Sequence, residues 1–255
     1  MEPPSQHSYS LGKWSEYADH YSDFAPLSDF RLSYTDCALI VIDAQRKTFD
    51  PNAVRGLANG FTKSFPRLSD AYFKRIIDIV LPNIINILHY FRRHSLTRFF
   101  TVVGPSLPSG KDLPFAFRAQ YSNALGNTDE SLITSSSPEF EVIDELYPHD
   151  NEPIVHKYGR SAFVNTNLHK RLSDEGIDQL ILVGGATHAC IDSTGRSAAD
   201  LGYKVAILED ACVSQFPLLH ETTMINFMMS MGRVMSTNDA IKELQNPINY
   251  SIKSE

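Results

Sequence analysis

The sequence predicts a single α/β domain built on a parallel sheet. Signals for strands and helices alternate through most of the 255 residues, a pattern typical of this fold class. Several strand signals are continuous apolar runs, as expected for parallel strands that are covered on both faces. The composition, 42% hydrophobic and 21% charged, is that of an ordinary globular protein with a sizeable core.

Charge and cysteine content exclude several classes of function. The net charge is −7 at pH 7, and no run of lysine and arginine exceeds two residues, so we expect neither nucleic acid nor a membrane as a partner. The three cysteines are far apart and form no CxxC pair, which indicates neither a disulfide framework nor a zinc site. We recognise no signal peptide, and a reducing compartment, the cytoplasm, fits the cysteine usage best.

Residues 1–33 are aromatic and polar without a clear period. We expect an N-terminal extension that lies on the domain surface or on a neighbouring subunit, with a partly disordered tail as the alternative. The domain itself is expected over residues 34–245, followed by a tail over 246–255. We find no internal repeat and no linker within the domain.

The first strand is predicted over residues 37–43, an apolar run that ends in an acid. Open α/β sheets bind their ligands at the carboxyl ends of the strands, so Asp43 is a candidate site residue. A loop to about Pro66 follows. Residues 67–94 predict a long helix with apolar side chains at helical spacing, and Pro82 should bend it or divide it in two.

A second strand is predicted over residues 98–104. The next segment, residues 105–151, has little periodicity and many Gly, Ser, Pro and Asn residues. A loop this long inside a compact domain is usually functional, so we expect part of a substrate lid that contains short helices. A strand over residues 152–157 then ends in Lys157, and residues 165–175 predict a helix.

The strand around which the chain is organised is predicted over residues 179–183. Gly184 and Gly185 predict a tight turn after it, and Cys190 falls in the first turn of the helix that continues to about Leu201. The remaining elements are a strand at 203–208, an apolar helix at 218–231, a short strand at 233–235 and a closing helix at 238–245.

Three polar residues each follow an apolar strand: Asp43, Lys157 and Cys190. The carboxyl ends of parallel strands lie at one edge of a sheet, so these side chains could converge. A thiolate would be the nucleophile, the carboxylate could take the thiol proton, and the ammonium could hold both anions in place. Taken singly, each has a structural explanation: a cap, a solvated lysine and a small packed cysteine. Their joint position favours a catalytic site.

The position of Cys190 suits a nucleophile. Free amides and the positive end of the helix dipole favour a thiolate at a helix N-terminus. Beside a cation, such a cysteine can have a pKa of roughly 3.5–7.5, and we expect a lowered pKa here. Backbone amides in the turn from Gly185 to Cys190 would supply an oxyanion hole.

Three blocks of the sequence resemble the cysteine hydrolases of the isochorismatase-like superfamily. They are Ala38-Leu-Ile-Val-Ile-Asp-Ala-Gln45 with Phe49, Lys157-Tyr-Gly-Arg-Ser-Ala-Phe163 with Asn165-Thr-Asn-Leu168, and Gly184-Gly-Ala-Thr-His-Ala-Cys190 with the small residues that follow it. Their order and spacing match over residues 37 to about 215. Residues 1–33 and 105–150 carry no such resemblance.

The resemblance implies a three-layer α/β/α, Rossmann-like fold with a six-stranded parallel sheet. It also implies the triad Asp43, Lys157 and Cys190, a cis peptide between Gly185 and Ala186, and an oxyanion hole made by the amides of Ala186 and Cys190. By this analogy Cys190 attacks an amide carbonyl, and a thioester forms as ammonia or an amine leaves. Water activated by Asp43 then releases the acid, and no cofactor takes part.

Two departures from the family narrow the expected activity. Its nicotinamidases hold a metal with an Asp-x-His pair, which this chain lacks, so no metal is expected. The true isochorismatases lack the cysteine that is present here as Cys190. A metal-free amidohydrolase of small amides, ureas or carbamoyl compounds remains, and the lysine block looks most like the ureidoacrylate and biuret-type branch. The alternatives are a vinyl ether hydrolase and a catalytically idle binding or assembly protein.

Five further residues are candidates for binding a small-molecule substrate: Phe49, Arg118, Gln120, Phe163 and His188. The two phenylalanines could instead belong to the core, Arg118 could be an ordinary solvated arginine, and His188 could be a surface or packing histidine. The remaining cysteines, at positions 37 and 212, are expected to be structural. The family commonly forms homo-oligomers, so a dimer or tetramer is expected.

Overall fold

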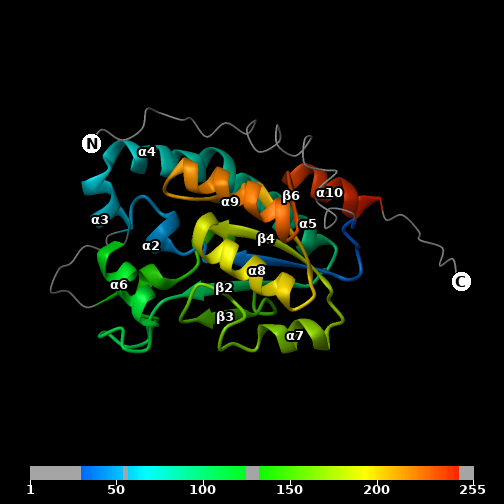
Figure 1. The fold of residues 1–255 in the computed structure, drawn as a ribbon, viewed down its shortest axis with the longest axis horizontal. Coiled ribbons are helices and arrows are strands. Elements are labelled where there is room, and N and C mark those ends of the chain that lie inside the picture. The colour runs from blue at the N-terminus through cyan, green and yellow to red at the C-terminus, as the bar shows by residue number, and fades with distance from the viewer. Residues whose placement is uncertain (1–29, 54–56, 125–131, 247–255) are drawn as a thin grey trace, which may run out of the picture.

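A six-stranded sheet forms the centre of the molecule in the computed structural model, which describes residues 30–53, 57–124 and 132–246 (Figure 1). The strand order is β3-β2-β1-β4-β5-β6, and every neighbouring pair is parallel. Helices lie on both faces of the sheet, which confirms the predicted three-layer α/β/α fold. Most of the expected N-terminal extension, residues 1–29, lies outside the described residues.

The strands lie close to their predicted positions. They are β1 (Cys37–Ile42), β2 (Arg98–Val103), β3 (Ile154–Lys157), β4 (Gln179–Gly185), β5 (Lys204–Val213) and β6 (Arg233–Met235). All residues of β1 and β4, the two central strands, are buried. Because the strands are parallel, their carboxyl ends open at one edge of the sheet, where site residues were expected.

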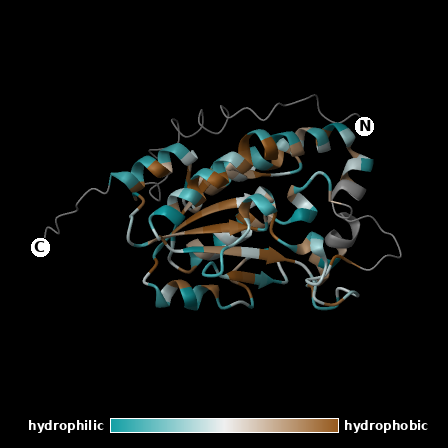
Figure 2. Ribbon diagram, turned by 180° about the vertical axis from the view of Figure 1, so that it is seen from behind, coloured by the Kyte–Doolittle hydropathy of each residue, from teal (hydrophilic) through white to brown (hydrophobic). Residues whose placement is uncertain are grey.

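Alternate residues of the strands face two separate hydrophobic cores, one on each side of the sheet. In Figure 2 most of the strands are brown, whereas the helices carry both hydrophobic and hydrophilic residues. On one face, Leu39 and Val41 pack with α4 (Pro66–Arg75), α5 (Leu81–Arg93) and α10 (Thr237–Gln245). On the other face, Ala38, Ile40 and Ile42 pack with α7 (Leu168–Asp174), α8 (Asp192–Asp200) and α9 (Pro217–Ser230). Burial on both faces explains why the central strands β1 and β4 are nearly continuous apolar runs.

The long helix predicted over residues 67–94 is present, but Pro82 does not divide it. Between α4 and α5 lies a π-helical turn, η3 (Ile76–Val80), in which the Leu81 amide bonds to the Ile76 carbonyl. A proline cannot donate to the carbonyl four residues before it. The wider π turn, immediately before Pro82, accommodates this loss while the chain remains helical.

Two segments predicted as loops contain helices. The segment between β1 and Pro66 holds α2 (Arg46–Phe49) and α3 (Leu57–Ser64). Residues 105–151 hold the short helices that were expected, which are α6 (Phe115–Ala124), η4 (Pro138–Phe140) and η5 (Asp144–Leu146). An antiparallel bridge between Gln45 and Val142 joins the two segments, so the chain after β1 is tied to the expected lid region.

The glycines after residue 183 continue the strand instead of forming the predicted turn. Gly184 pairs with Ile42 of β1 and Cys212 of β5. It has a φ of 118°, and a Cβ built on it would lie 2.1 Å from the Ile42 carbonyl oxygen. Gly184 therefore permits a close approach of β1 to β4. A short π-helix, η6 (Thr187–Ile191), then leads into α8.

Two predicted boundaries in the second half of the chain also shift. Helix α7 begins at Leu168, three residues later than predicted, because Asn165 has a left-handed φ of 56°. Strand β5 continues to Val213, and its pairing with β4 changes register between Leu182 and Gly184. No helix among the described residues is long and apolar enough to cross a membrane.

Candidate active site

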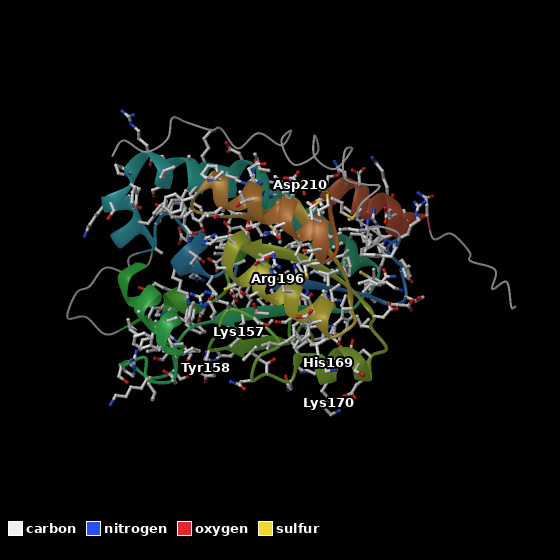
Figure 3. The ribbon with its side chains drawn as sticks, in the orientation of Figure 1. Lys157, Tyr158, His169, Lys170, Arg196 and Asp210 are labelled. Carbon is white, nitrogen blue, oxygen red and sulfur yellow. The ribbon has the colours of Figure 1, made fainter. Side chains whose placement is uncertain are left out.

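Asp43, Lys157 and Cys190 meet at the carboxyl edge of the sheet. Asp43 follows β1, Lys157 ends β3 (Figure 3), and Cys190 lies in η6, beyond β4. The Nζ atom of Lys157 lies 2.7 Å from Oδ2 of Asp43, and both residues act on the pKa of the Cys190 thiol beside them. All three side chains are buried. The fold thus assembles the three residues that the sequence pattern singled out.

The Asp43 carboxylate is held by bonds to both of its oxygens. Thr101 of β2, the strand between β1 and β3, donates its hydroxyl to Oδ1 at 2.6 Å, while Lys157 donates to Oδ2. Asp43 has a left-handed φ of 52°, a conformation that aspartate tolerates better than most residues. Lys157 also donates to the Gly159 carbonyl at 3.1 Å. The carboxylate and ammonium are therefore fixed beside the thiol.

The expectation of a lowered pKa for Cys190 is wrong. Burial raises the pKa of the thiol to about 12; Lys157 opposes this rise and Asp43 adds to it. The enclosed position beside a carboxylate outweighs the favourable charge of the lysine. Cys190 is therefore a thiol at neutral pH, and any nucleophilic attack by its sulfur would require the proton to move to a base. Asp43 is the carboxylate whose charge acts on this thiol.

Lys157, unlike Cys190, is held in its charged form. Burial alone would lower its pKa, but the neighbouring Asp43 and Cys190 outweigh burial and raise it. Lys157 is therefore an ammonium at neutral pH. A permanently charged group at this point stabilises negative charge that develops on either the sulfur or the carboxylate.

The backbone turn before Cys190 contains a cis peptide bond between Gly185 and Ala186, at the position that the resemblance implied. The Ala186 carbonyl accepts the amides of Ala189 and Ile191 at 3.0 and 3.3 Å, which ties the turn into η6. The ring of Phe49 packs against Gly185 and is buried. Phe49 thus supports the turn from the core side.

Comparison with known proteins is consistent with this geometry. A family model described as the isochorismatase domain matches residues 37–239, which span β1 to α10 and include all three converging side chains.

The chain belongs to the isochorismatase family.

Two relatives are both named ureidoacrylate amidohydrolase RutB. The protein of Acinetobacter baylyi is 35% identical over 115 residues, which are 45% of this chain and 47% of that relative. The protein of Agrobacterium fabrum is 27% identical over 215 residues, 82% of this chain and 90% of its own length. A cysteine hydrolase of Pseudomonas syringae pv. phaseolicola shares the fold, with a TM-score of 0.68, 22% identity and coverage of 86% and 97% of the two chains.

His188 lies near the thiol in this isochorismatase-family site. Its Nδ1 atom is 2.7 Å from the Ser214 hydroxyl. Burial lowers the pKa of His188, and the positive charge of Arg160 lowers it further, while Asp192 opposes both. The imidazole is therefore neutral at neutral pH and can exchange hydrogen bonds with a ligand. Its role in substrate binding stays a prediction.

The outcome differs for each of the three other residues that were predicted to bind substrate. The Phe163 ring packs on Tyr203, with centroids 5.7 Å apart. Tyr203 precedes β5, at the amino end of that strand, so Phe163 belongs to the packing around α7 and not to the strand-end edge. The stem of Arg118 in α6 lies close to Gly110, and its role in substrate binding stays a prediction. Gln120 is in the same helix, but its side chain lies outside the described part of the structure.

The sequence argument missed Lys47, a second buried lysine in α2. Its ammonium donates to the Val103 carbonyl at the end of β2, and its pKa responds to all three members of the triad. Nothing in the local sequence distinguishes it, because Arg46 and Thr48 beside it are also polar. Only the turn of α2, which directs residue 47 inward, places it at the strand ends.

A buried polar network beneath the turn was also missed. His220 of α9 bonds to the Thr187 hydroxyl at 2.9 Å and to Arg75 at 3.3 Å. Arginine can only donate, so Nε2 of His220 accepts, and Nδ1 carries the proton donated to Thr187. Arg75 in turn bonds to the carbonyls of Glu209 and Cys212. A polar residue within an apolar helix, as at His220, was the available signal.

The described residues contain no group of three or more His, Cys, Asp and Glu side chains arranged to hold a metal ion. The chemistry available at the strand ends is that of a thiol, a carboxylate, the Lys157 ammonium and the Lys47 amine, whose pKa burial lowers to about 7.

Proposed function

We propose that this isochorismatase-family protein hydrolyses a C–N bond of a small amide, urea or carbamoyl compound through a thioester on Cys190. The observation that carries the proposal is the buried thiol at the strand ends beside the Asp43–Lys157 ion pair, whose two charges both act on the pKa of the thiol. A protonated nucleophile beside its own base and a fixed cation is suited to acyl transfer. The name of the RutB relatives, ureidoacrylate amidohydrolase, supports the same class of reaction.

In the first half of the reaction, Sγ of Cys190 attacks the carbonyl carbon while Asp43 takes the thiol proton. The carbonyl oxygen becomes an oxyanion, for which the amides of Ala186 and Cys190 are the proposed donors. The C–N bond then breaks, and the proton held by Asp43 passes to the leaving nitrogen. Ammonia or an amine departs, and the acyl group remains on Cys190 as a thioester.

In the second half, water attacks the thioester carbonyl and Asp43 takes a proton from it. Collapse of this tetrahedral intermediate breaks the C–S bond, the acid leaves, and the sulfur recovers its proton from Asp43. Lys157 holds the carboxylate in place through both halves, because it bonds Oδ2 directly. The atoms balance with water as the only co-reactant.

Ammonia release from a panel of small amides, ureas and carbamoyl compounds tests this proposal. We expect the wild type to release ammonia in the presence of a metal chelator and Cys190→Ala to release none. Acid quenching during turnover should trap an acyl adduct, detected by mass spectrometry on the peptide that contains Cys190. Cys37→Ala, which changes a buried thiol at the amino end of β1, is the matched control and should keep its turnover.

Ammonia release that survives in Cys190→Ala would show that Cys190 is not the nucleophile. If no compound gives turnover or an adduct, the vinyl ether hydrolase or a catalytically idle protein of the same fold is favoured instead.

The assembly and cellular location are further parts of the proposal. We propose a homo-oligomer, a dimer or tetramer, which light scattering of the purified chain would measure. We also propose a reducing compartment, the cytoplasm, a proposal supported by the three cysteines, which are all free and buried.

A further inference from the structure

Thr101 holds Asp43 through two bonds, one to its backbone and one to its carboxylate. The Asp43 amide donates to the Thr101 carbonyl at 3.1 Å, and the Thr101 hydroxyl donates to Oδ1 at 2.6 Å. Lys157 donates to the other oxygen, Oδ2, at 2.7 Å. Each oxygen of the carboxylate therefore has its own fixed donor, one on β2 and one on β3, and a rotation of the carboxylate would break both bonds.

The rest of the surroundings of Thr101 are apolar. Thr101 is fully buried, and its partners on the neighbouring strands are Ile42 of β1 and Val155 of β3. Phe99 and Val103, two residues before and after it in β2, pack into the hydrophobic core on the same face of the sheet. Valine has nearly the same shape and carries no hydroxyl, which costs free energy to bury unless it is hydrogen-bonded. Packing alone therefore does not account for a threonine at this position.

We propose that Thr101 is a positioning residue, whose hydroxyl keeps the Asp43 carboxylate turned toward the Cys190 thiol so that the carboxylate can take the thiol proton. This inference rests on the proposed function and adds to it the group that orients the base. The bond from Lys157 to Oδ2 would by itself leave Oδ1 free to turn. A general base must lie within hydrogen-bond reach of the proton that it takes, and a misplacement of about 1 Å can cost roughly a hundredfold in rate.

A purely structural role for this hydroxyl is the alternative, and Thr237 provides a matched control for it. Thr237 is also fully buried. Its hydroxyl donates to Oδ1 of Asp210 at 2.7 Å, and its amide donates to the same carboxylate. Asp210 lies on β5, well apart from Lys157 in Figure 3. Thr237→Val therefore removes a similar buried bond from hydroxyl to carboxylate away from the triad.

Alkylation of Cys190 by iodoacetamide at pH 8, followed by mass spectrometry, tests the inference without a substrate. Burial raises the pKa of the thiol and Asp43 adds to that rise, so a carboxylate that turns away should leave the thiol more reactive. We expect Thr101→Val to accelerate alkylation roughly threefold, about half a pKa unit. Thr101→Ser, which keeps the hydroxyl, and Thr237→Val should react like the wild type. In an Asp43→Asn background Thr101→Val should add nothing, because the charge that it releases is already absent.

Turnover of the compound that the wild type hydrolyses fastest is the second measurement. Thr101→Val should lower kcat roughly tenfold and leave KM almost unchanged, because the base is misplaced while the groups that bind the substrate remain. Thr101→Ser should keep most of the wild-type kcat. Thr237→Val should keep its turnover, although urea unfolding should show a similar loss of stability in both valine variants. Destabilisation of the fold then does not account for a change that is confined to Thr101→Val.

Three results would overturn the inference. The first is alkylation in Thr101→Val that is unchanged or slower than in the wild type. The second is an equal acceleration in the Asp43→Asn background, which would show that Thr101 acts on the thiol without Asp43. The third is an unchanged kcat in Thr101→Val. Ammonia release that survives in Cys190→Ala would instead contradict the proposed function, and the alkylation rates would still measure whether Thr101 holds Asp43 beside the thiol.

Discussion

The reactivity of Cys190 depends on two charged neighbours with opposite effects. Lys157 favours the thiolate, whereas Asp43 disfavours it, and burial adds to the effect of Asp43. In the resting protein the thiol and the carboxylate form one proton-transfer pair. In the proposed mechanism the thiolate is thus generated during attack, when a substrate is in place, and is not present beforehand. Such a thiol should be protected from adventitious alkylation and oxidation.

This arrangement predicts that Asp43→Asn makes Cys190 more reactive while it abolishes turnover. Removing the carboxylate removes a cause of the raised pKa and leaves Lys157 to stabilise the thiolate. We expect alkylation of Cys190 by iodoacetamide at pH 8 to accelerate roughly tenfold, which corresponds to about one pKa unit. The wild type should react slowly, with a rate that still rises at pH 10. Mass spectrometry of the Cys190 peptide measures both.

Lys157→Met should have the opposite effect and slow the same alkylation, because the charge that stabilises the thiolate is lost. Unchanged alkylation in Asp43→Asn would show that the carboxylate does not act on the thiol, and the assignment of Asp43 as the base would fail with it.

At the scale of the elements, the approach of β4 to β1 sets the position of the nucleophile turn. Gly184 faces the Ile42 carbonyl at a distance that excludes a Cβ, and its φ of 118° is one that other residues rarely adopt. The turn that carries Ala186 and Cys190 begins directly after this contact. The pairing of β1 with β4 therefore determines where the thiol lies relative to Asp43, at the end of β1.

We expect Gly184→Ala to destabilise the fold by at least about 3 kcal/mol, since a steric clash adds to backbone strain of about 1–2 kcal/mol. Gly202→Ala is the matched control. Gly202 has a φ of 93°, but no atom lies within 4 Å of its added Cβ, so only the strain of about 1–2 kcal/mol is expected. Urea unfolding of both variants measures the difference. Equal losses would show that β1 and β4 can separate without penalty.

For the whole molecule, one buried carboxylate links helix α5 to strand β2 and to the loop before β3. Glu152 accepts bonds from Arg92 at the end of α5, from Arg98 of β2 and from the His149 amide. Burial alone would raise its pKa, but these bonds outweigh it and lower the pKa from 4.5 to about 2. The charged form of Glu152 therefore stabilises the folded state.

The pKa of Glu152 is lower in the folded than in the unfolded protein, so its contribution is complete above about pH 5 and is lost as the pH falls toward 2. The shift corresponds to a stabilisation on the order of 3 kcal/mol. We expect Glu152→Gln to lose about this amount at pH 7, and the difference from the wild type to shrink by half or more at pH 3. Urea midpoints at both pH values measure it. A difference independent of pH would contradict the assignment.

Much of the fold could be predicted because its signals are local. The apolar runs at 37–43 and 98–104 identify strands by composition alone, and their parallel pairing follows from the helices between them. Asp43, Lys157 and Cys190 could be found because each directly follows such a run. Their convergence needs only the rule that parallel strands end at one edge.

The features that the sequence does not predict depend on contacts between segments that are distant in the chain. Gly184 looks like a turn residue in the sequence, and only the neighbouring β1 backbone explains its place in a strand. The raised pKa of Cys190 results from enclosure by the whole domain, which helix-terminus arguments do not include. The positions of Lys47 and His220 are explained by their hydrogen bonds to Val103 and Thr187. No sequence spacing predicts these contacts.

The left-handed backbone at Asp43 has a practical consequence for capturing a substrate complex. A variant that binds but does not react should keep the shape of the strand end. Alanine at position 43 would lose the carboxylate and also strain the backbone at a φ of 52°, whereas asparagine tolerates this conformation nearly as well as aspartate does. Asp43→Asn is therefore the variant to crystallise with an uncleaved amide, and Asp43→Ala is the one to avoid.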